Sequence, residues 1–235
     1  MKLTDIHIKE LYKFTRKHYV EHYDVQTELV DHLANDIEEI CNEKPSLSFK
    51  EARDLSFKKF GVFGFMEVVE QKQKAMNKRY WKILWRFFKE WFTVPKLLIT
   101  ATIYMIFCVL LQIKYSEYIL LGCVFILAIV DLILISINHK KRKEKERKKE
   151  NIFLLESMIG TTRHSYASLI LVNLFNLINL SDINFSSLAI HWIFVSAFIA
   201  TLLCILFYVV NYVIPQKAEE LLQETYPEYK IVKNL

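Results

Sequence analysis

The chain has 235 residues, of which 53% are apolar and 24% charged, and its formal net charge is +5. Charge is concentrated in residues 1 to about 92, and long apolar runs follow, which excludes a single soluble globular domain. The sequence has only four glycines, and its four cysteines form no CxxC pair. It therefore offers no Gly-rich phosphate loop and no metal-ligand spacing, and we expect no catalytic residue, no metal and no cofactor.

Residues 1–75 predict a small cytoplasmic helical domain. Apolar periodicity predicts helices over about residues 4–19, 24–42, 48–60 and 63–80. Asp24 is expected to cap the second helix, and Ser48 with Glu51 forms a capping-box pattern for the third. In the core we expect the apolar stripe of the second helix, an aromatic plug and a glycine that stops the third helix: Leu29, Leu33, Phe60 and Gly61.

Four short motifs within residues 10–75 carry a family resemblance. They are Glu28-Leu29, His32-Leu33, Glu51-Ala52 and Phe60-Gly61. In this order they resemble the permease-prefix domains and the helical signalling domains associated with PadR-type regulators, which precede membrane helices in bacterial proteins. The resemblance implies a regulatory or interaction domain, not a catalytic one. The whole chain also resembles multi-pass membrane proteins of Flavobacteriia, and it lacks the large extracytoplasmic domain of the permeases.

An acidic face is expected on the second helix, because residues 21–43 contain eight acidic side chains and no Lys or Arg. Glu28, His32 and Asp36 lie four residues apart and share one side of the helix with Asp31. This spacing suits a divalent metal ion, but it is not HExxH and lacks ligands from a second element. We therefore favour a solvated acidic face that binds a cytosolic partner or folds back onto the basic run 140–149.

Residues 79–92 read RYWKILWRFFKEWF and hold three of the four tryptophans. Basic and aromatic residues together can bind nucleic acid, but directly before an apolar run they favour an interfacial amphipathic helix, here over residues 76–93. Its rings and cations would bind lipid headgroups, which are anionic at a cytoplasmic surface. The expected anchors are Arg79, Trp81, Trp85, Arg86 and Trp91.

Four apolar runs follow, over about residues 97–113, 118–137, 165–181 and 188–214. A spanning helix needs roughly 17–25 residues, so we expect an all-α protein with a four-helix transmembrane bundle over residues 94–214. Eight basic residues and one acidic residue lie between residues 71 and 96, and eight basic and three acidic residues lie between 140 and 150. The connections after the first and third runs are short and nearly uncharged.

The charge distribution predicts the orientation of the chain. Because positive loops stay in the cytoplasm, both termini, the basic loop 138–164 and the tail 215–235 are expected there. The first apolar run would act as the targeting signal, because no cleavable signal peptide precedes it. We therefore expect a multi-pass protein of a bacterial inner membrane.

Asp131 is the only acidic residue within the four expected spans. By residue count from the cytoplasmic side it lies at a depth similar to Asn173, Tyr208 and Asn211. Interhelical hydrogen bonding is the simpler account of this polar cluster. The alternative is an ion or proton path lined by Asp131 and the stripe of Asn173, Asn176 and Asn179.

The leading functional expectation is a regulatory, scaffolding or assembly protein. Its partners would be membrane lipids and another membrane or cytosolic protein, or a second copy of itself, but not nucleic acid. The alternative is a small transporter or channel subunit that uses Asp131. A continuous hydrated path to that residue would favour the alternative, and a dry bundle would favour the first reading.

Overall fold

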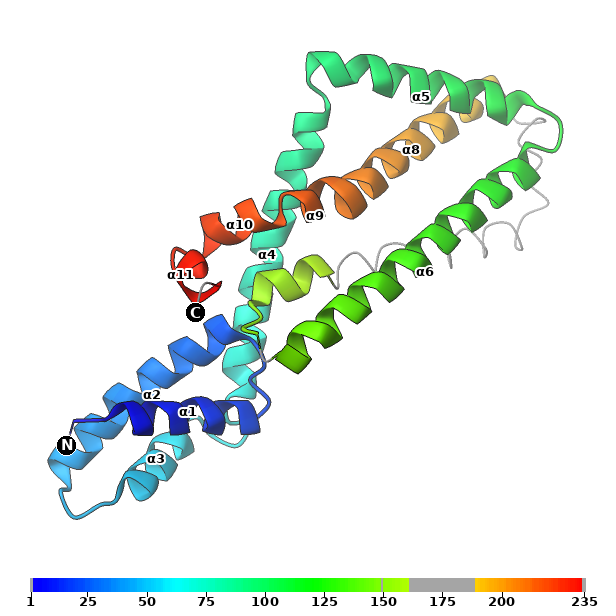
Figure 1. Ribbon diagram of the computed structural model, residues 1–235. Coiled ribbons are helices and arrows are strands. Elements are labelled where there is room, and N and C mark those ends of the chain that lie inside the picture. Colours follow the sequence, from blue (N-terminus) through cyan, green and yellow to red (C-terminus); the bar gives the residue numbers. More distant parts are fainter. Residues whose placement is uncertain (1, 149, 161–188, 234–235) are drawn as a thin grey trace. The chain divides into compact units, whose positions relative to one another are not determined.

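The computed structural model describes residues 2–148, 150–160 and 189–233, and the elements in this part of the chain are all helical (Figure 1). The expected all-α class is thereby confirmed for the described residues. The chain divides into two compact units. Unit 1 comprises Met1–Arg79 and Glu150–Ser157, and unit 2 comprises Tyr80–Lys149 and Met158–Leu235.

Unit 1 is built from three short helices and the start of a long one. They are α1 (Asp5–Lys17), α2 (Tyr23–Glu43), α3 (Phe49–Lys58) and the first half of α4 (Met66–Trp91). The α2 helix packs against both α1 and α3. Leu29 and Leu33 on α2 are buried, as expected for an apolar stripe, whereas Phe60 is only partly buried. Phe65 is 1% exposed and supplies the aromatic plug that the sequence suggested for Phe60.

The ends of α3 follow the sequence signals. The backbone N–H of Ser48 donates to Glu51 Oε2 at 2.8 Å, and the N–H of Glu51 donates to Ser48 Oγ at 3.4 Å, so the expected capping box is confirmed. Gly61 follows the helix with φ of 73°, the left-handed region that glycine enters without strain. The expectation that Asp24 caps α2 is wrong, because α2 begins at Tyr23 with His22 at the N-cap.

The α4 helix runs without a break from Met66 to Trp91. The expected boundary between a domain ending at residue 75 and an interfacial helix starting at residue 76 therefore falls inside one helix. The boundary between the two units along the chain falls within α4, between Arg79 and Tyr80. No glycine or proline interrupts this stretch of sequence, which explains why the helix continues.

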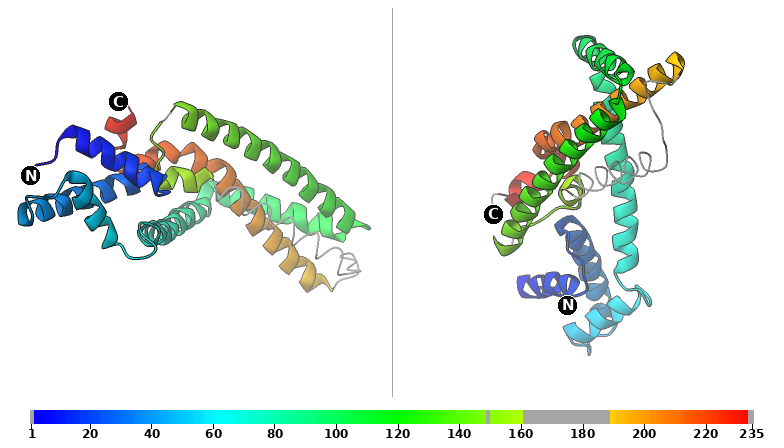
Figure 2. Two further views of the ribbon diagram at one scale, coloured as in Figure 1. Left: turned by 90° about the horizontal axis from the view of Figure 1, so that it is seen from below. Right: turned by 90° about the vertical axis from the view of Figure 1, so that its right-hand side faces the viewer.

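Among its described residues, unit 2 has three long apolar helices, α5 (Val94–Gln112), α6 (Ser116–Lys148) and α8 (Ile190–Tyr208) (Figure 2). The α5 and α8 helices make the most extensive contact between elements, and α6 touches α5 over a smaller area. Their shared buried cluster consists of small and branched side chains: Cys108, Leu111, Ile193 and Ala197. Most other side chains of α5 are exposed although they are apolar, which is typical of a surface that faces lipid.

Three segments within the described residues are long and apolar enough to cross a membrane: Val94–Gln112, Tyr118–Lys145 and Ile190–Gln216. They correspond to the first, second and fourth expected spans, and they indicate a membrane protein. The expected third span, 165–181, lies outside the described residues. The four-helix bundle therefore stays a prediction.

The segments that we expected as a loop, 138–164, and as a tail, 215–235, both contain helices. The α6 helix continues through Lys148, so much of the expected basic loop 138–164 is an extension of the second apolar helix. The expected tail 215–235 folds as well, with Leu221 and Leu222 nearly fully buried. After α8 the chain forms η2, a π-helical turn (Val209–Val213), then α9 (Ile214–Gln216), α10 (Ala218–Thr225) and α11 (Tyr229–Lys233).

Candidate functional site

The acidic face of α2 is partly neutralised within unit 1. Lys72 Nζ lies 2.6 Å from Glu28 Oε2, and Lys59 Nζ lies 2.5 Å from Asp36 Oδ1. His32 is exposed, and its ring meets Phe60 edge-on with 5.8 Å between centroids. Of the four residues expected on this face, Asp31 and His32 have no ion pair within the described contacts, so a partner would meet a narrower acidic surface than the sequence indicated.

The Asp36–Lys59 pair alters the ionisation of both groups. Desolvation opposes ionisation of Asp36, but the hydrogen bond and the positive charge of Lys59 favour it, and the pKa of Asp36 falls below its ordinary value. The hydrogen bond to Asp36 raises the pKa of Lys59. Both shifts favour the charged forms, so this contact ties the end of α3 to the middle of α2 at neutral pH.

Residues 150–157 form part of unit 1 although they follow the long α6 helix in the sequence. The backbone N–H of Tyr23 donates to the carbonyl of Ile152 at 2.9 Å, and the N–H of Leu154 donates to Asp24 Oδ1 at 2.9 Å. The rings of Tyr23 and Phe153 meet at 5.4 Å between centroids. Chain segments more than a hundred residues apart are thus joined at the start of α2.

The apolar side chains of this docked segment are removed from water. Phe153 is 1% exposed and Leu155 is fully buried. A helix begins at residue 154, and the Asp24 carboxylate accepts from its first turn, which is the position where a negative charge stabilises a helix start. Asp24 is therefore a cap, as its residue type suggested, but for a different helix.

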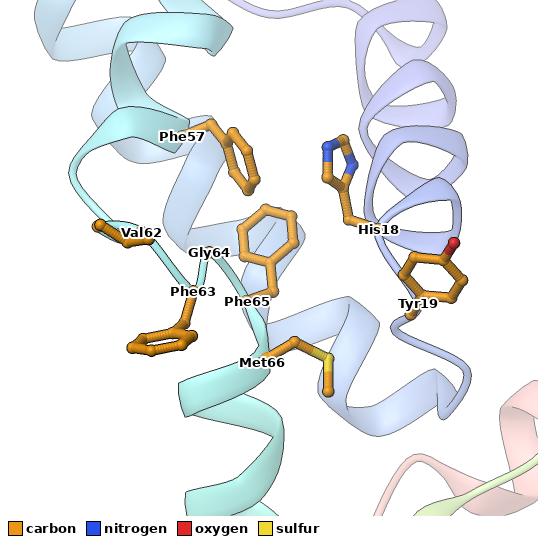
Figure 3. Close-up of a pocket in the computed structure, with 9 residues that line it drawn as sticks. His18, Tyr19, Phe57, Val62, Phe63, Gly64, Phe65 and Met66 are labelled. Atoms are coloured by element: carbon orange, nitrogen blue, oxygen red, sulfur yellow. The ribbon is translucent and has the colours of Figure 1, made fainter.

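A second feature of unit 1 is the turn between α3 and α4, drawn in Figure 3. The rings of Phe57, Phe65 and His18 gather on its inner side, and Val62 and Phe63 point outward. The Phe57 centroid lies 4.6 Å from that of His18 and 4.8 Å from that of Phe65. A hollow of about 220 Å³ opens beside these rings. Val62 and Phe63 are apolar yet exposed, so sequence reasoning alone would place them in the core.

The expected membrane-interface anchors divide into two groups. Trp81 and Trp85 are more than half exposed, and Arg79 is exposed. Trp91 is instead held by neighbouring helices: its indole N–H donates to Thr100 Oγ1 at 3.1 Å, and its ring lies 5.1 Å from that of Tyr208. Only the first group presents its aromatic side chains outward, as headgroup contact requires.

Arg86 joins α4 to the folded C-terminal segment. Its guanidinium lies 3.4 Å from the Glu224 carboxylate on α10. Next to it, Lys217 Nζ lies 5.4 Å from the centre of the Phe87 ring, which is itself buried. The buried side of α4 in unit 2 is lined by Tyr80, Ile83, Leu84 and Phe87. The amphipathic helix thus has a protein-facing side, which leaves only the side that carries Trp81 and Trp85 for the expected lipid contacts.

The members of the expected intramembrane polar cluster have different surroundings. Asp131 is 2% exposed, as expected for a carboxyl group that avoids lipid. Asn211 is also buried and lies in the π-helical turn, where its side-chain amide donates to the carbonyl of Phe207 at 3.0 Å. The Tyr208 ring lies 5.1 Å from that of Trp91 and 5.1 Å from that of Tyr212, tilted against both. Asn173, with Asn176 and Asn179, lies outside the described residues, so the cluster as a whole stays a prediction.

Sequence reasoning missed the docked segment and the exposed turn. One signal for the first was present: Ile152 to Leu155 are four consecutive apolar residues in an expected cytoplasmic loop. Such a run is costly in water unless it is covered. Neither feature is a metal centre, and nowhere in the described part of the chain do three His, Cys, Asp or Glu side chains gather as a metal site would require.

Comparison with known proteins adds no family to these observations. No family model, curated protein or solved structure matches the chain.

Proposed function

We propose that this chain is a regulatory, scaffolding or assembly protein of a bacterial inner membrane, with unit 1 in the cytoplasm as its interaction domain. The observation that carries the proposal is the docking of residues 150–157 into the core of unit 1. The domain is attached through α4 to the first apolar helix and through this segment to the end of the second. A protein that binds unit 1 would therefore affect both links between the domain and the apolar helices, α4 and residues 150–157.

The partner surface that we propose is the outward side of α2. Its exposed members include Asp31, Glu39 and Glu43, which keep the acidic character of the helix. A basic surface on a membrane or cytosolic protein would complement them, and long-range attraction would speed its encounter. Glu28 and Asp36 contribute less charge, because lysines of unit 1 pair with them.

Purification of the tagged full-length protein from its native membranes in mild detergent tests this function. We expect a protein to copurify with the wild type and to be lost from the variant Asp31→Lys/Glu39→Lys. The matched control is Glu67→Lys, which reverses an exposed acidic residue on α4 outside this surface. Equal recovery of every copurifying protein from wild type and double variant would contradict the proposed surface.

The second candidate is a small transporter or channel subunit, and the burial of Asp131 favours it. A buried carboxyl group within an apolar helix is expensive to maintain and often marks an ion or proton path. Asp131→Asn distinguishes the two functions. If Asp131 is structural, the amide keeps a hydrogen-bond donor and acceptor, and the cellular phenotype persists. Loss of the phenotype at normal protein level and topology would favour the transporter.

A further inference from the structure

The turn between α3 and α4 exposes several large apolar side chains, although it lies outside the long apolar helices. Val62 is 99% exposed, Phe63 77% and Met66 52%, and Tyr19 at the end of α1 is 80% exposed. These four residues line the hollow beside Phe57 and Phe65, together with His18 (Figure 3). We call them the Val62 surface. Contiguous exposed apolar side chains of this kind mark interaction sites.

The backbone holds this surface in place. The N–H of Gly61 donates to the carbonyl of Lys58 at 3.1 Å, and the N–H of Gly64 donates to that of Gly61 at 3.3 Å. Gly64 has φ of 55°, and a Cβ at this position would lie 2.9 Å from the Phe57 ring. The buried side of the turn therefore fixes its shape, and Val62 and Phe63 are exposed because the hydrogen-bonded turn leaves them no core position.

The charges beside the Val62 surface are mainly positive. Within two residues of the residues that line the hollow, the sequence has four cations, Arg16, Lys17, Lys58 and Lys59, and two carboxylates, Glu21 and Glu67, and Lys59 is already paired with Asp36 of α2. All six side chains are exposed. The acidic residues of unit 1 are concentrated on α2 instead. Apolar side chains with a cationic rim complement an anionic bilayer, where the chains enter the headgroup region and the cations remain at its surface.

We propose that the Val62 surface inserts into the headgroup region of an anionic lipid bilayer and docks unit 1 on the membrane. A bilayer is favoured over a protein because three helices in the described part of the chain are able to cross one, so lipid is always within reach of the domain. Attraction at Arg16, Lys17 and Lys58 would hold the apolar side chains against the bilayer surface. This inference does not depend on the proposed function, because it requires no protein partner.

A solvent-sensitive fluorophore on the full-length protein tests the proposal. The four native cysteines are replaced by alanine, Val62→Cys is labelled with NBD, and the protein is reconstituted into nanodiscs of phosphatidylcholine with or without phosphatidylglycerol. Substitution is well tolerated at Val62, because its side chain is almost fully exposed. The matched control is labelled Ser46→Cys, also exposed, which α3 separates from the turn by about 15 Å of helix.

We expect the Val62 label to shift to the blue in phosphatidylglycerol discs and to be quenched severalfold more by spin-labelled lipid than the Ser46 label. Arg16→Glu/Lys17→Glu should reduce both effects. A Val62 label that reports water in both kinds of disc would overturn the proposal. So would a label that becomes shielded only when soluble protein is added, because the surface would then bind a protein. Circular dichroism of each labelled variant verifies that the helices remain folded.

Discussion

Gly61 and Gly64 have the same backbone handedness but different surroundings. Their φ angles are 73° and 55°, both in the region that is strained for a residue with a side chain. No atom lies within 4 Å of the position where a Cβ on Gly61 would be, whereas the Phe57 ring occupies that place beside Gly64. Substitution of Gly61 therefore tests backbone strain alone, and substitution of Gly64 tests backbone strain together with steric overlap.

Gly61→Ala should destabilise unit 1 by about 1–2 kcal/mol through backbone strain alone. Gly64→Ala should cost about 1–3 kcal/mol more, because the Phe57 ring must move within the cluster it forms with Phe14, His18 and Phe65. Hydrogen exchange of α3 amides in the full-length protein measures both effects. Equal losses of protection in the two variants would show that the ring moves at no cost.

The Asp36–Lys59 contact gives unit 1 a pH dependence whose sign follows from the lowered pKa of Asp36. A carboxyl group with a lowered folded-state pKa stabilises the fold above its ordinary value of about 3.9 and loses that contribution as the pH falls through the lowered value. The contact is partly open to solvent, so the contribution is small.

Asp36→Asn should therefore destabilise unit 1 slightly at pH 7 and make no difference once the pH is well below the ordinary carboxyl range. Thermal unfolding of wild type and variant, compared over an acid pH series, measures this convergence. A stability difference that stays constant as the pH falls would mean that the charge of Asp36 is not what stabilises the pair.

At the scale of elements, the short segment 150–157 owes its buried position to contacts with residues far away in the sequence. Its residues have no helical periodicity that would mark a buried face, and its partners Tyr23 and Asp24 lie 130 residues earlier in the sequence than the residues they contact. Burial of the Phe153 ring and of the leucines after it removes apolar surface from water that a free loop would expose. The segment therefore contributes to the stability of the domain.

Phe153→Ala should lower the stability of unit 1 by about 3–5 kcal/mol, the usual loss when a buried phenylalanine is truncated. The effect should be greatest at the start of α2, where Tyr23 loses its ring contact. Protease sensitivity and hydrogen exchange of residues 20–30 measure it. Asn151→Ala, an exposed position in the same segment, is the control and should behave as the wild type.

For the molecule as a whole, features set by local pattern were predictable, and features set by distant contacts were not. Periodicity and capping predicted the helices of unit 1 and the capping box at Ser48, because these depend on residues a few positions apart. Hydropathy predicted the three apolar helices in the described residues. The burial of Phe153 and the exposure of Val62 could not be predicted, because residue type alone does not show which apolar group finds a partner.

The orientation of the chain in the membrane is a prediction at the same scale. Reporter fusions at Leu235 and Asn184 should report opposite compartments, with Leu235 in the cytoplasm, because Lys and Arg are concentrated in residues 71–96 and 140–149. The same compartment for both fusions would rule out four crossings. Replacing the basic residues of 140–149 with glutamine should produce a mixture of orientations, which alkaline phosphatase activity at the two positions measures.

The contact between Tyr23 and Ile152 has a consequence for how the protein is made. Translation proceeds from the N-terminus, so all of α5 and α6 leaves the ribosome before Phe153 does. Unit 1 can therefore reach its complete core only after both of these apolar helices have been synthesised and residues 150–157 have been left on the same side of the bilayer as the domain. A chain in which only one of these two helices crossed the bilayer would leave residues 150–157 on the side opposite unit 1, and the domain would stay incomplete and open to proteolysis.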